Sequence, residues 1–167
     1  TLLKRIRAKI LLALPSFVST SGVLKFQSAL ALQCFTNEYI YDQKASEEKA
    51  IQALEASVEE ALSKSEQPSP KAILCLASYK ALHEYKWCNL LTDSSEIHHV
   101  FMRQVREPKL EIDLKSNMLM LEEITNEVSI KVRAQYEDNP YPRWVNLGLN
   151  FNPEPITKVV SQSKIKL

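Results

Sequence analysis

Glycine is nearly absent from this chain of 167 residues, which holds only Gly22 and Gly148. Glycine usually makes up about 7% of a protein sequence. Tight β-hairpin turns, phosphate-binding loops and dinucleotide-binding turns depend on glycine, because only glycine takes a positive φ, or approaches a ligand closely, at no steric cost. The shortage argues against a β-sheet protein or a nucleotide-binding domain, and it favours helices joined by Pro, Ser and Asn.

Residues that commonly hold metals are also few. The three cysteines, Cys34, Cys75 and Cys88, form no C-x-x-C pair. His98 and His99 are adjacent, so on a helix their side chains point about 100° apart and cannot bind one metal ion from one face. We predict no metal site and cysteines that pack as small apolar side chains. An odd number of cysteines also favours a reduced, cytoplasmic protein over a disulfide scaffold.

Charge is balanced overall but unevenly spread. The net charge is +1, and no apolar run approaches the ~20 residues that span a bilayer. Residues 1–37 contain five Lys or Arg and no acid, whereas residues 38–70 contain eight acids and three lysines. In one interpretation the two segments form neighbouring faces of one bundle. In the other, the basic segment 1–37 forms a patch that binds phosphate or a membrane surface. No aromatic residues alternate with the early basic residues, and we predict neither nucleic acid nor membrane as a partner.

Apolar residues recur at helical spacing along much of the chain. The stripes are Leu3, Ile6, Ile10 and Leu14, then Val23, Phe26, Leu30 and Cys34, and then Ile51, Leu54, Val58 and Leu62. They predict helices over about residues 1–14, 22–41, 46–62, 70–85 and 124–137. Ser46 and Asp93 are expected N-caps, and Pro70 suits a first helical turn. Pro108 is expected to start or kink a further helix. The fold class predicted is an all-α bundle of about six to eight helices.

Glu38 interrupts an otherwise apolar helix just before Tyr39. A buried carboxylate must be paired or hydrogen-bonded. We therefore expect Glu38 to anchor an arginine or a backbone end within the bundle, with ligand binding as the alternative. Other carboxylate pairs in the sequence are typical of solvated helix faces, and no general acid–base site can be recognised.

The most distinctive segment is residues 136–145, which read Tyr-Glu-Asp-Asn-Pro-Tyr-Pro-Arg-Trp-Val. Pro140 and Pro142 fix φ and push the residue before each of them out of the helical region. The chain must then leave a helix at about Asn139 and continue as a stiff C-terminal Pro/aromatic extended arm. The arm residues that could line a pocket edge are Tyr136, Asn139, Tyr141, Arg143 and Trp144.

Two hypotheses fit this arm. In the first it is a structural strap, whose rings pack on the bundle while Arg143 pairs with an acid. In the second it borders a cofactor or substrate pocket, because aromatic faces stack on adenine and Arg143 can meet a carboxylate with two hydrogen bonds.

Three stretches give the chain a resemblance to a known family. They are "VRAQYEDNPYPRWV" (Val132–Val145), "ALALQCFTNEYIY" (Ala29–Tyr41) and "MRQVREPKLE" (Met102–Glu111). In their order along the chain they resemble the helical region that precedes the catalytic domain in bacterial S-adenosylmethionine-dependent methyltransferases, which often carry tetratricopeptide repeats at their N-terminus. The resemblance covers roughly Leu2 to Val145, and no tetratricopeptide pattern occurs within the chain.

The resemblance implies that residues 1–135 form a helical bundle and residues 136–167 an arm and linker toward a catalytic domain outside this sequence. The resemblance implies that this chain itself binds no cofactor and that the parent protein binds S-adenosylmethionine. The expected roles are substrate recognition, pocket capping or subunit contact. The expected partners are the catalytic domain of the same polypeptide, a protein substrate or a second copy. The alternative is a stand-alone helical adaptor that binds a protein partner.

Overall fold

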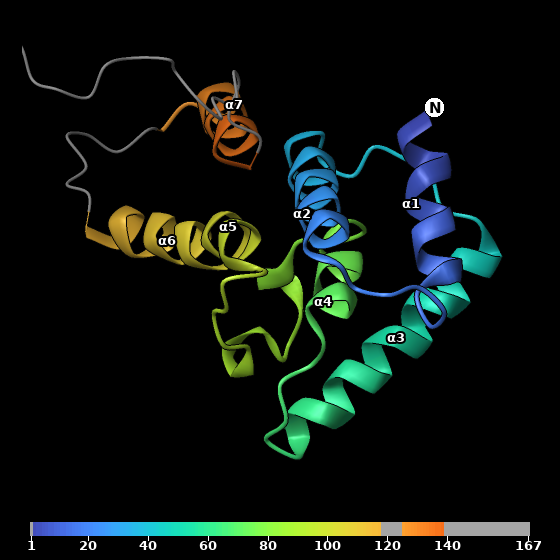
Figure 1. Cartoon of the computed structure of the whole chain (residues 1–167). Coiled ribbons are helices and arrows are strands. Elements are labelled where there is room, and N and C mark those ends of the chain that lie inside the picture. The colour runs from blue at the N-terminus through green and yellow to red at the C-terminus, as the bar shows by residue number, and fades with distance from the viewer. Residues whose placement is uncertain (1, 118–124, 139–167) are drawn as a thin grey trace, which may run out of the picture. The chain divides into compact units, whose positions relative to one another are not determined.

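The computed structural model of this chain describes residues 2–117 and 125–138 (Figure 1). The chain divides into two compact units, residues 1–122 and residues 123–167. The elements of the first unit are α1 (Leu2–Ala13), α2 (Ser21–Thr36), α3 (Ala45–Ser63), α4 (Pro70–Ala77), η1 (Leu82–Glu84), η2 (Cys88–Leu90), α5 (His98–Phe101), η3 (Met102–Arg106) and α6 (Glu107–Asn117). The second unit contains α7 (Glu127–Asp138). The predicted all-α class is confirmed, and the described ranges contain no strand.

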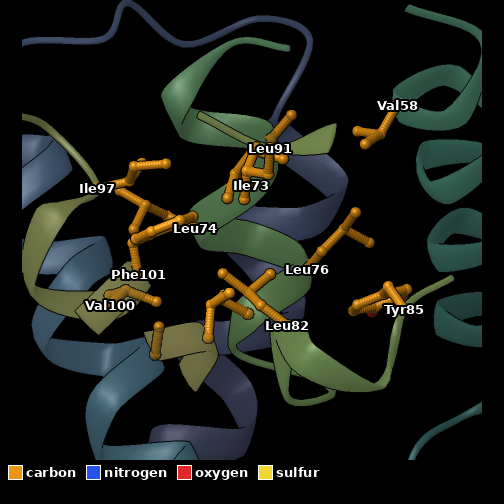
Figure 2. Packing of buried hydrophobic residues seen from close by; sticks show 14 of the residues in the cluster. Val58, Ile73, Leu74, Leu76, Leu82, Tyr85, Leu91, Ile97, Val100 and Phe101 are labelled. Atoms are coloured by element: carbon orange, nitrogen blue, oxygen red, sulfur yellow. The ribbon is translucent and has the colours of Figure 1, made fainter. Parts of the chain in front are cut away.

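Helix α4 lies at the centre of the first unit, and α2, α3 and α1 pack against it (Figure 1). Every side chain from Ala72 to Ala77 is buried, which explains why this short segment is apolar on all sides. Figure 2 shows the surrounding cluster, to which α3, η1 and α5 also contribute. Its labelled members are Val58, Ile73, Leu74, Leu76, Leu82, Tyr85, Leu91, Ile97, Val100 and Phe101.

The buried face of α1 differs from the predicted one. Leu14, just beyond the helix, is buried as expected, but the buried residues within α1 are Arg7 and Leu11. Leu3, Ile6 and Ile10 are only partly buried. The buried line is therefore Arg7, Leu11 and Leu14, at spacings of four and three, and an arginine occupies one of its positions.

Two helix ends also depart from expectation. Helix α2 ends at Thr36 rather than near residue 41, because Glu38 and Tyr39 both have φ of 53°, which a continuing helix cannot accommodate. The N-cap of α3 is Lys44, so Ser46 lies inside the helix and the prediction of a Ser46 cap is wrong. Glu47 reaches back to accept the Lys44 backbone N–H at 3.1 Å, as the glutamate of a capping box does.

The predicted helix over residues 70–85 is shorter in the structure. Pro70 begins α4 as expected, but α4 ends at Ala77 and the chain turns before the short 3₁₀ helix η1. Ser78 closes α4 by donating its hydroxyl to the Cys75 carbonyl at 2.7 Å. Tyr85 and Trp87 follow in the connecting segment, with their rings stacked 4.6 Å apart.

Helical backbone runs continuously from α5 through η3 into α6. The segment η3 is a π-helical turn, in which Glu107 donates its N–H to the Met102 carbonyl five residues earlier. Pro108, predicted to start or kink a helix, is the second residue of α6, but the helical run that contains it already begins at α5. Asp93, the predicted N-cap of the next helix, does not cap α5, so this prediction is wrong. Its carboxylate instead lies 2.9 Å from Nδ1 of His98, and Ile97 is the N-cap residue of α5.

Helix α7 is described as far as Asp138, and the predicted exit from a helix at about Asn139 lies outside the described residues. Within the described ranges, no helix combines the length and the apolar character needed to cross a bilayer.

Candidate functional site

The predicted pocket-edge residues fall largely beyond the described part of the chain. Tyr136 lies on α7 with 59% of its surface exposed. The other four, Asn139, Tyr141, Arg143 and Trp144, lie outside the described residues. The two hypotheses for the arm, strap and pocket border, therefore stay predictions, and three polar sites inside the first unit become the candidates to examine.

The first site is the side chain of Gln104, which is completely buried in the π-helical turn. Its Oε1 accepts the backbone N–H of Leu82 at 3.1 Å. Its Nε2 donates to the carbonyls of Ala31 on α2, at 3.3 Å, and Ala77 at the end of α4, at 3.1 Å. One carboxamide thus joins α2, α4, η1 and η3, and three backbone groups in the core receive partners.

Two of the three stretches that carry the family resemblance meet at this point. Ala31 and Tyr39 belong to the 29–41 stretch, and Gln104 belongs to the 102–111 stretch. Tyr39 donates its hydroxyl to the same Ala77 carbonyl, at 3.1 Å. The motif residues of these two stretches therefore build the junction of α2, α4 and η3, which is an architectural role and not a ligand site.

A histidine supports the same turn. Pro108 has no N–H to offer the Gln104 carbonyl four residues before it. Nδ1 of His83 lies 3.0 Å from that oxygen and donates to it in the Nδ1–H tautomer. A histidine from η1, 21 residues earlier in the chain, thus satisfies the backbone where a proline follows the π-helical turn.

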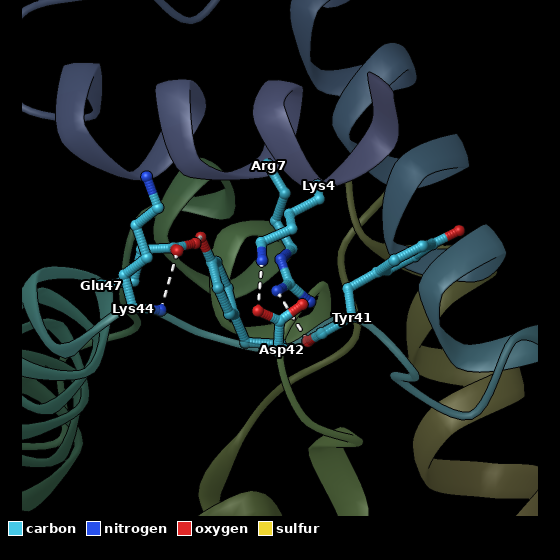
Figure 3. A network of polar contacts seen from close by, with 7 residues as sticks. Lys4, Arg7, Tyr41, Asp42, Lys44 and Glu47 are labelled. Carbon is cyan, nitrogen blue, oxygen red and sulfur yellow. Dashed lines mark hydrogen bonds and ion pairs between the residues drawn. The ribbon is translucent and has the colours of Figure 1, made fainter. Parts of the chain in front are cut away.

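The second site is a buried polar network around Arg7, shown in Figure 3. Arg7 is 1% exposed. Its guanidinium donates to the carbonyls of Tyr41 at 3.2 Å and Ser78 at 3.5 Å, and it lies 4.1 Å from the ring centre of Tyr79. Arginine tolerates this environment because its weakly hydrated, planar charge packs on aromatic faces. This network ties α1 to the 37–44 loop and to the end of α4.

A carboxylate completes the network, and it is not the one predicted. Glu38 is exposed, so the expectation of a buried Glu38 that anchors an arginine or a backbone end within the bundle is wrong as to its burial. Glu47 is the buried acid, with 2% exposure, and it accepts the Tyr79 hydroxyl at 2.9 Å as well as the Lys44 N–H. Tyr79 thus stands between the charge of Arg7 and that of Glu47.

The thiols near Arg7 are kept protonated. Burial raises the pKa of Cys34 and raises that of Cys75 to about 12, while the charge of Arg7 opposes both shifts. Burial, followed by the hydrogen bond to Glu47, raises the pKa of the Tyr79 hydroxyl. A thiol needs its thiolate form to act as a nucleophile. These cysteines are thus packing residues, as the sequence predicted.

The raised pKa of Cys75 predicts a loss of stability in alkali. Above its ordinary pKa of 9.0 the thiol ionises in the unfolded chain, whereas the native thiol keeps its proton until about pH 12. The native state then binds more protons, so stability falls as pH rises through this window. Between pH 7.5 and 10.5 this residue should contribute a loss of roughly 2 kcal/mol. Urea unfolding of wild type and Cys75→Ala at both pH values measures it, and an equal pH dependence in both proteins would contradict the assignment.

The third site is a groove of about 360 Å³ between the facing ends of α1 and α2. Its walls carry five apolar residues, one lysine, one glutamine and a glycine. The lining residues are Lys9, Ile10, Ala13, Phe17, Gly22, Val23, Phe26 and Gln27. Its volume lies at the lower end of the range for small-molecule sites.

Gln27, one of the lining residues, has a buried polar atom without a partner. The residue is 1% exposed, and its Nε2 donates to the Lys71 carbonyl at 3.3 Å. Its Oε1 is buried and has no hydrogen-bond partner in the structure. An unmatched buried acceptor costs about 1–3 kcal/mol. Lys71 also fixes the groove wall, because its ammonium donates to the carbonyls of Leu14 and Phe17.

Metal binding has no support in the described residues, where no three His, Cys, Asp or Glu side chains come together. The chain matches no protein-family model, no curated protein and no solved structure.

Sequence reasoning missed all three polar sites. Each central residue, Arg7, Gln27 or Gln104, occupies a position where helical spacing places an apolar side chain. Gln27 lies four residues after Val23, and Arg7 lies four residues before Leu11. A polar residue within an apolar stripe is the sequence signal for such a site, because its side chain must find buried hydrogen-bond partners or a ligand.

Proposed function

We propose that this chain is the helical, non-catalytic region of an S-adenosylmethionine-dependent methyltransferase-like protein, and that it binds rather than transforms. One observation carries this proposal. Two of the three sequence stretches that resemble the family, about 70 residues apart, are joined by the hydrogen bond from Gln104 to Ala31. Because residues of these two stretches bond to each other in the core, we expect the same helical arrangement in the family that the stretches resemble.

Within this proposal the catalytic domain of the same polypeptide holds S-adenosylmethionine, and this chain contributes no residue to the chemistry. The helical region recognises a protein substrate, caps the pocket or joins two copies. The arm residues Tyr136, Asn139, Tyr141, Arg143 and Trp144 are its proposed edge toward that pocket. We place the protein in the cytoplasm, because its three cysteines are all buried and unpaired.

A stand-alone helical adaptor is the second candidate, and α6 favours it. Leu110 and Leu114, one turn apart on the same face of this helix, are 55% and 66% exposed, whereas Ile112, 66% exposed, lies on the other side. Exposed apolar side chains gathered on one element are typical of protein-binding surfaces. An adaptor would use such a helix to bind a protein partner without any role in catalysis.

Calorimetry with S-adenosylmethionine separates the two candidates. The ligand is titrated into this chain and into the polypeptide that its gene encodes in full. We expect saturable binding only to the full polypeptide, because the glycine-rich turn that holds the cofactor has no counterpart in residues 1–167. Absence of binding to the full polypeptide would overturn the methyltransferase proposal and leave the adaptor.

The same titration tests the arm. If Trp144 borders the cofactor, Trp144→Ala in the full polypeptide should weaken S-adenosylmethionine binding by about tenfold, which corresponds to the loss of one aromatic contact. Unchanged affinity would remove cofactor contact and leave the strap hypothesis. Trp87→Ala is unsuitable as a control because Trp87 is 4% exposed in the core, and Phe26→Ala, which removes a half-exposed ring that is not part of the arm, serves better.

A further inference from the structure

We propose that two copies of this chain form a dimer, in which α1 of each copy packs on α3 of the other. The outer face of α1 is a line of two leucines and two cations, Leu2, Arg5, Lys9 and Leu12. The acidic side of α3 is the line Glu48, Glu55 and Glu59. The dimer rests on one part of the function proposed above, the joining of two copies, and needs neither the arm nor a catalytic domain. Its failure therefore leaves the calorimetry with S-adenosylmethionine unaffected.

Opposite charges are separated along the chain, and the fold leaves some of them unmatched. Residues 1–37 contain five Lys or Arg and no acid, whereas residues 38–70 contain eight acids and three lysines. Lys4 pairs with Asp42, and the buried Arg7 is held by backbone carbonyls. Within the part of the chain that the structure describes, no ion pair involves the charges of the outer face of α1 or the acidic side of α3. A partner is thus able to neutralise them.

The outer face of α1 points away from the core. Successive residues of an α-helix are about 100° apart, so residues two positions apart lie on nearly opposite sides. Arg5 and Lys9 each lie two positions from the buried Arg7, and both are exposed. Leu2 and Leu12, on the same side, are 72% and 64% exposed. This face combines two cations with two apolar side chains that the described residues do not cover.

The acidic side of α3 is a single line along that helix. Glu48, Glu55 and Glu59 follow one another at spacings of seven and four, which keeps them on one side. Glu48 and Glu59 are exposed, and Glu55 is half-buried. Lys49, the exposed lysine next to Glu48, lies about 100° around the helix from this line. The line therefore presents negative charge alone.

The two faces match in spacing as well as in sign. Arg5 and Lys9 are one helical turn apart, about 6 Å along the axis, and so are Glu55 and Glu59. Like charges at this spacing repel each other within a helix. Pairing the cations with the glutamates removes both repulsions and covers the two leucines. Because surface ion pairs alone contribute little, burial of the leucines is part of the driving force.

A second copy is the partner that satisfies both faces. An unrelated acidic protein or an anionic membrane would match α1 alone. In the first unit α1 and α3 pack against each other (Figure 1). A two-fold axis beside this pair of helices forms the contact twice, once from each copy, and closes the assembly at two chains.

Analytical ultracentrifugation of the chain at increasing concentration tests the proposal. We expect a weak dimer, with a dissociation constant of roughly 10 μM at low ionic strength. Salt screens charges, so raising the ionic strength from about 50 mM to about 500 mM should weaken the dimer by about tenfold or more. A chain that stays monomeric at a concentration about twentyfold above that constant would overturn the proposal.

Charge reversal identifies the two faces. Arg5→Glu/Lys9→Glu makes both faces of a copy acidic, and Glu55→Lys/Glu59→Lys makes both faces basic. Neither variant should dimerise alone, while circular dichroism stays unchanged. Mixed in equal amounts, they should form a dimer about as tight as the wild-type one, because every contact again joins a basic face to an acidic one. A mixture that stays monomeric, or either variant dimerising alone, would refute the assigned faces.

Matched variants separate these faces from charge and exposure in general. Lys25→Glu on α2 and Glu66→Lys beyond the end of α3 change exposed charges outside both faces and should keep wild-type association. Leu12→Ala should weaken the dimer about tenfold. Leu90→Ala, which removes a leucine of similar exposure, 58%, on η2, should not. Equal association of the two leucine variants would overturn the place of Leu12 in the contact.

Discussion

Replacing Gln104 with leucine should lower the free energy of unfolding by about 3 kcal/mol, although the two side chains are close in size. The change removes the acceptor of the Leu82 N–H and one donor each from the Ala31 and Ala77 carbonyls. Because Gln104 is completely buried, water cannot replace these partners. Urea unfolding followed by circular dichroism measures the loss, and Gln52→Leu on the exposed face of α3 should change stability by less than about 0.5 kcal/mol.

The Ala77 carbonyl, which accepts hydrogen bonds from two side chains, allows a second test of the same junction. Ala77 O accepts from both Tyr39 and Gln104, so each single variant leaves it one side-chain donor. The double variant Tyr39→Phe/Gln104→Leu leaves the Ala77 carbonyl without either side-chain donor. We therefore expect the double loss to exceed the sum of the single losses by at least about 0.5 kcal/mol. Strict additivity would show that the two donors act independently.

Replacing Arg7 with alanine should cost about 3 kcal/mol of stability. The substitution empties a large buried volume next to Tyr79 and leaves the Tyr41 and Ser78 carbonyls without their side-chain donor. Cavity formation and lost hydrogen bonds each contribute about 2 kcal/mol. Relief from holding a buried charge offsets roughly 1 kcal/mol of this.

Arg5→Ala is the matched control, because Arg5 is an exposed arginine on the same helix. It should alter stability by less than about 0.5 kcal/mol. Arg7→Met separates packing from polar bonding, since methionine fills most of the volume but donates no hydrogen bond. A loss for Arg7→Ala no greater than that for Arg5→Ala would refute the buried network.

The helical class was predictable because its causes are local. Scarce glycine excludes the turns that sheets need, and Val58 and Leu62 lie on a stripe that becomes the buried face of α3. Pro70 was placed correctly in the first turn of α4, since its missing N–H group is tolerated there.

The polar core was not predictable in the same way. Glu38 and Glu47 both lie near apolar helices in the sequence, and only the position of Tyr79, more than 30 residues away, decides that Glu47 is the buried one. Likewise, Lys44 rather than Ser46 caps α3 because the Glu47 carboxylate returns to its N–H. Such choices depend on partners from distant segments, which periodicity along one helix does not record.

Native-state hydrogen exchange at the Leu82 amide tests most directly the central claim, that the buried carboxamide of Gln104 joins α2, α4 and η1 in one core. This N–H donates to Gln104 Oε1 and lies within a completely buried residue. It should exchange only through global unfolding in the wild-type protein, and much faster in Gln104→Leu. Exchange of the wild-type amide at the rate of an unprotected peptide would contradict the account.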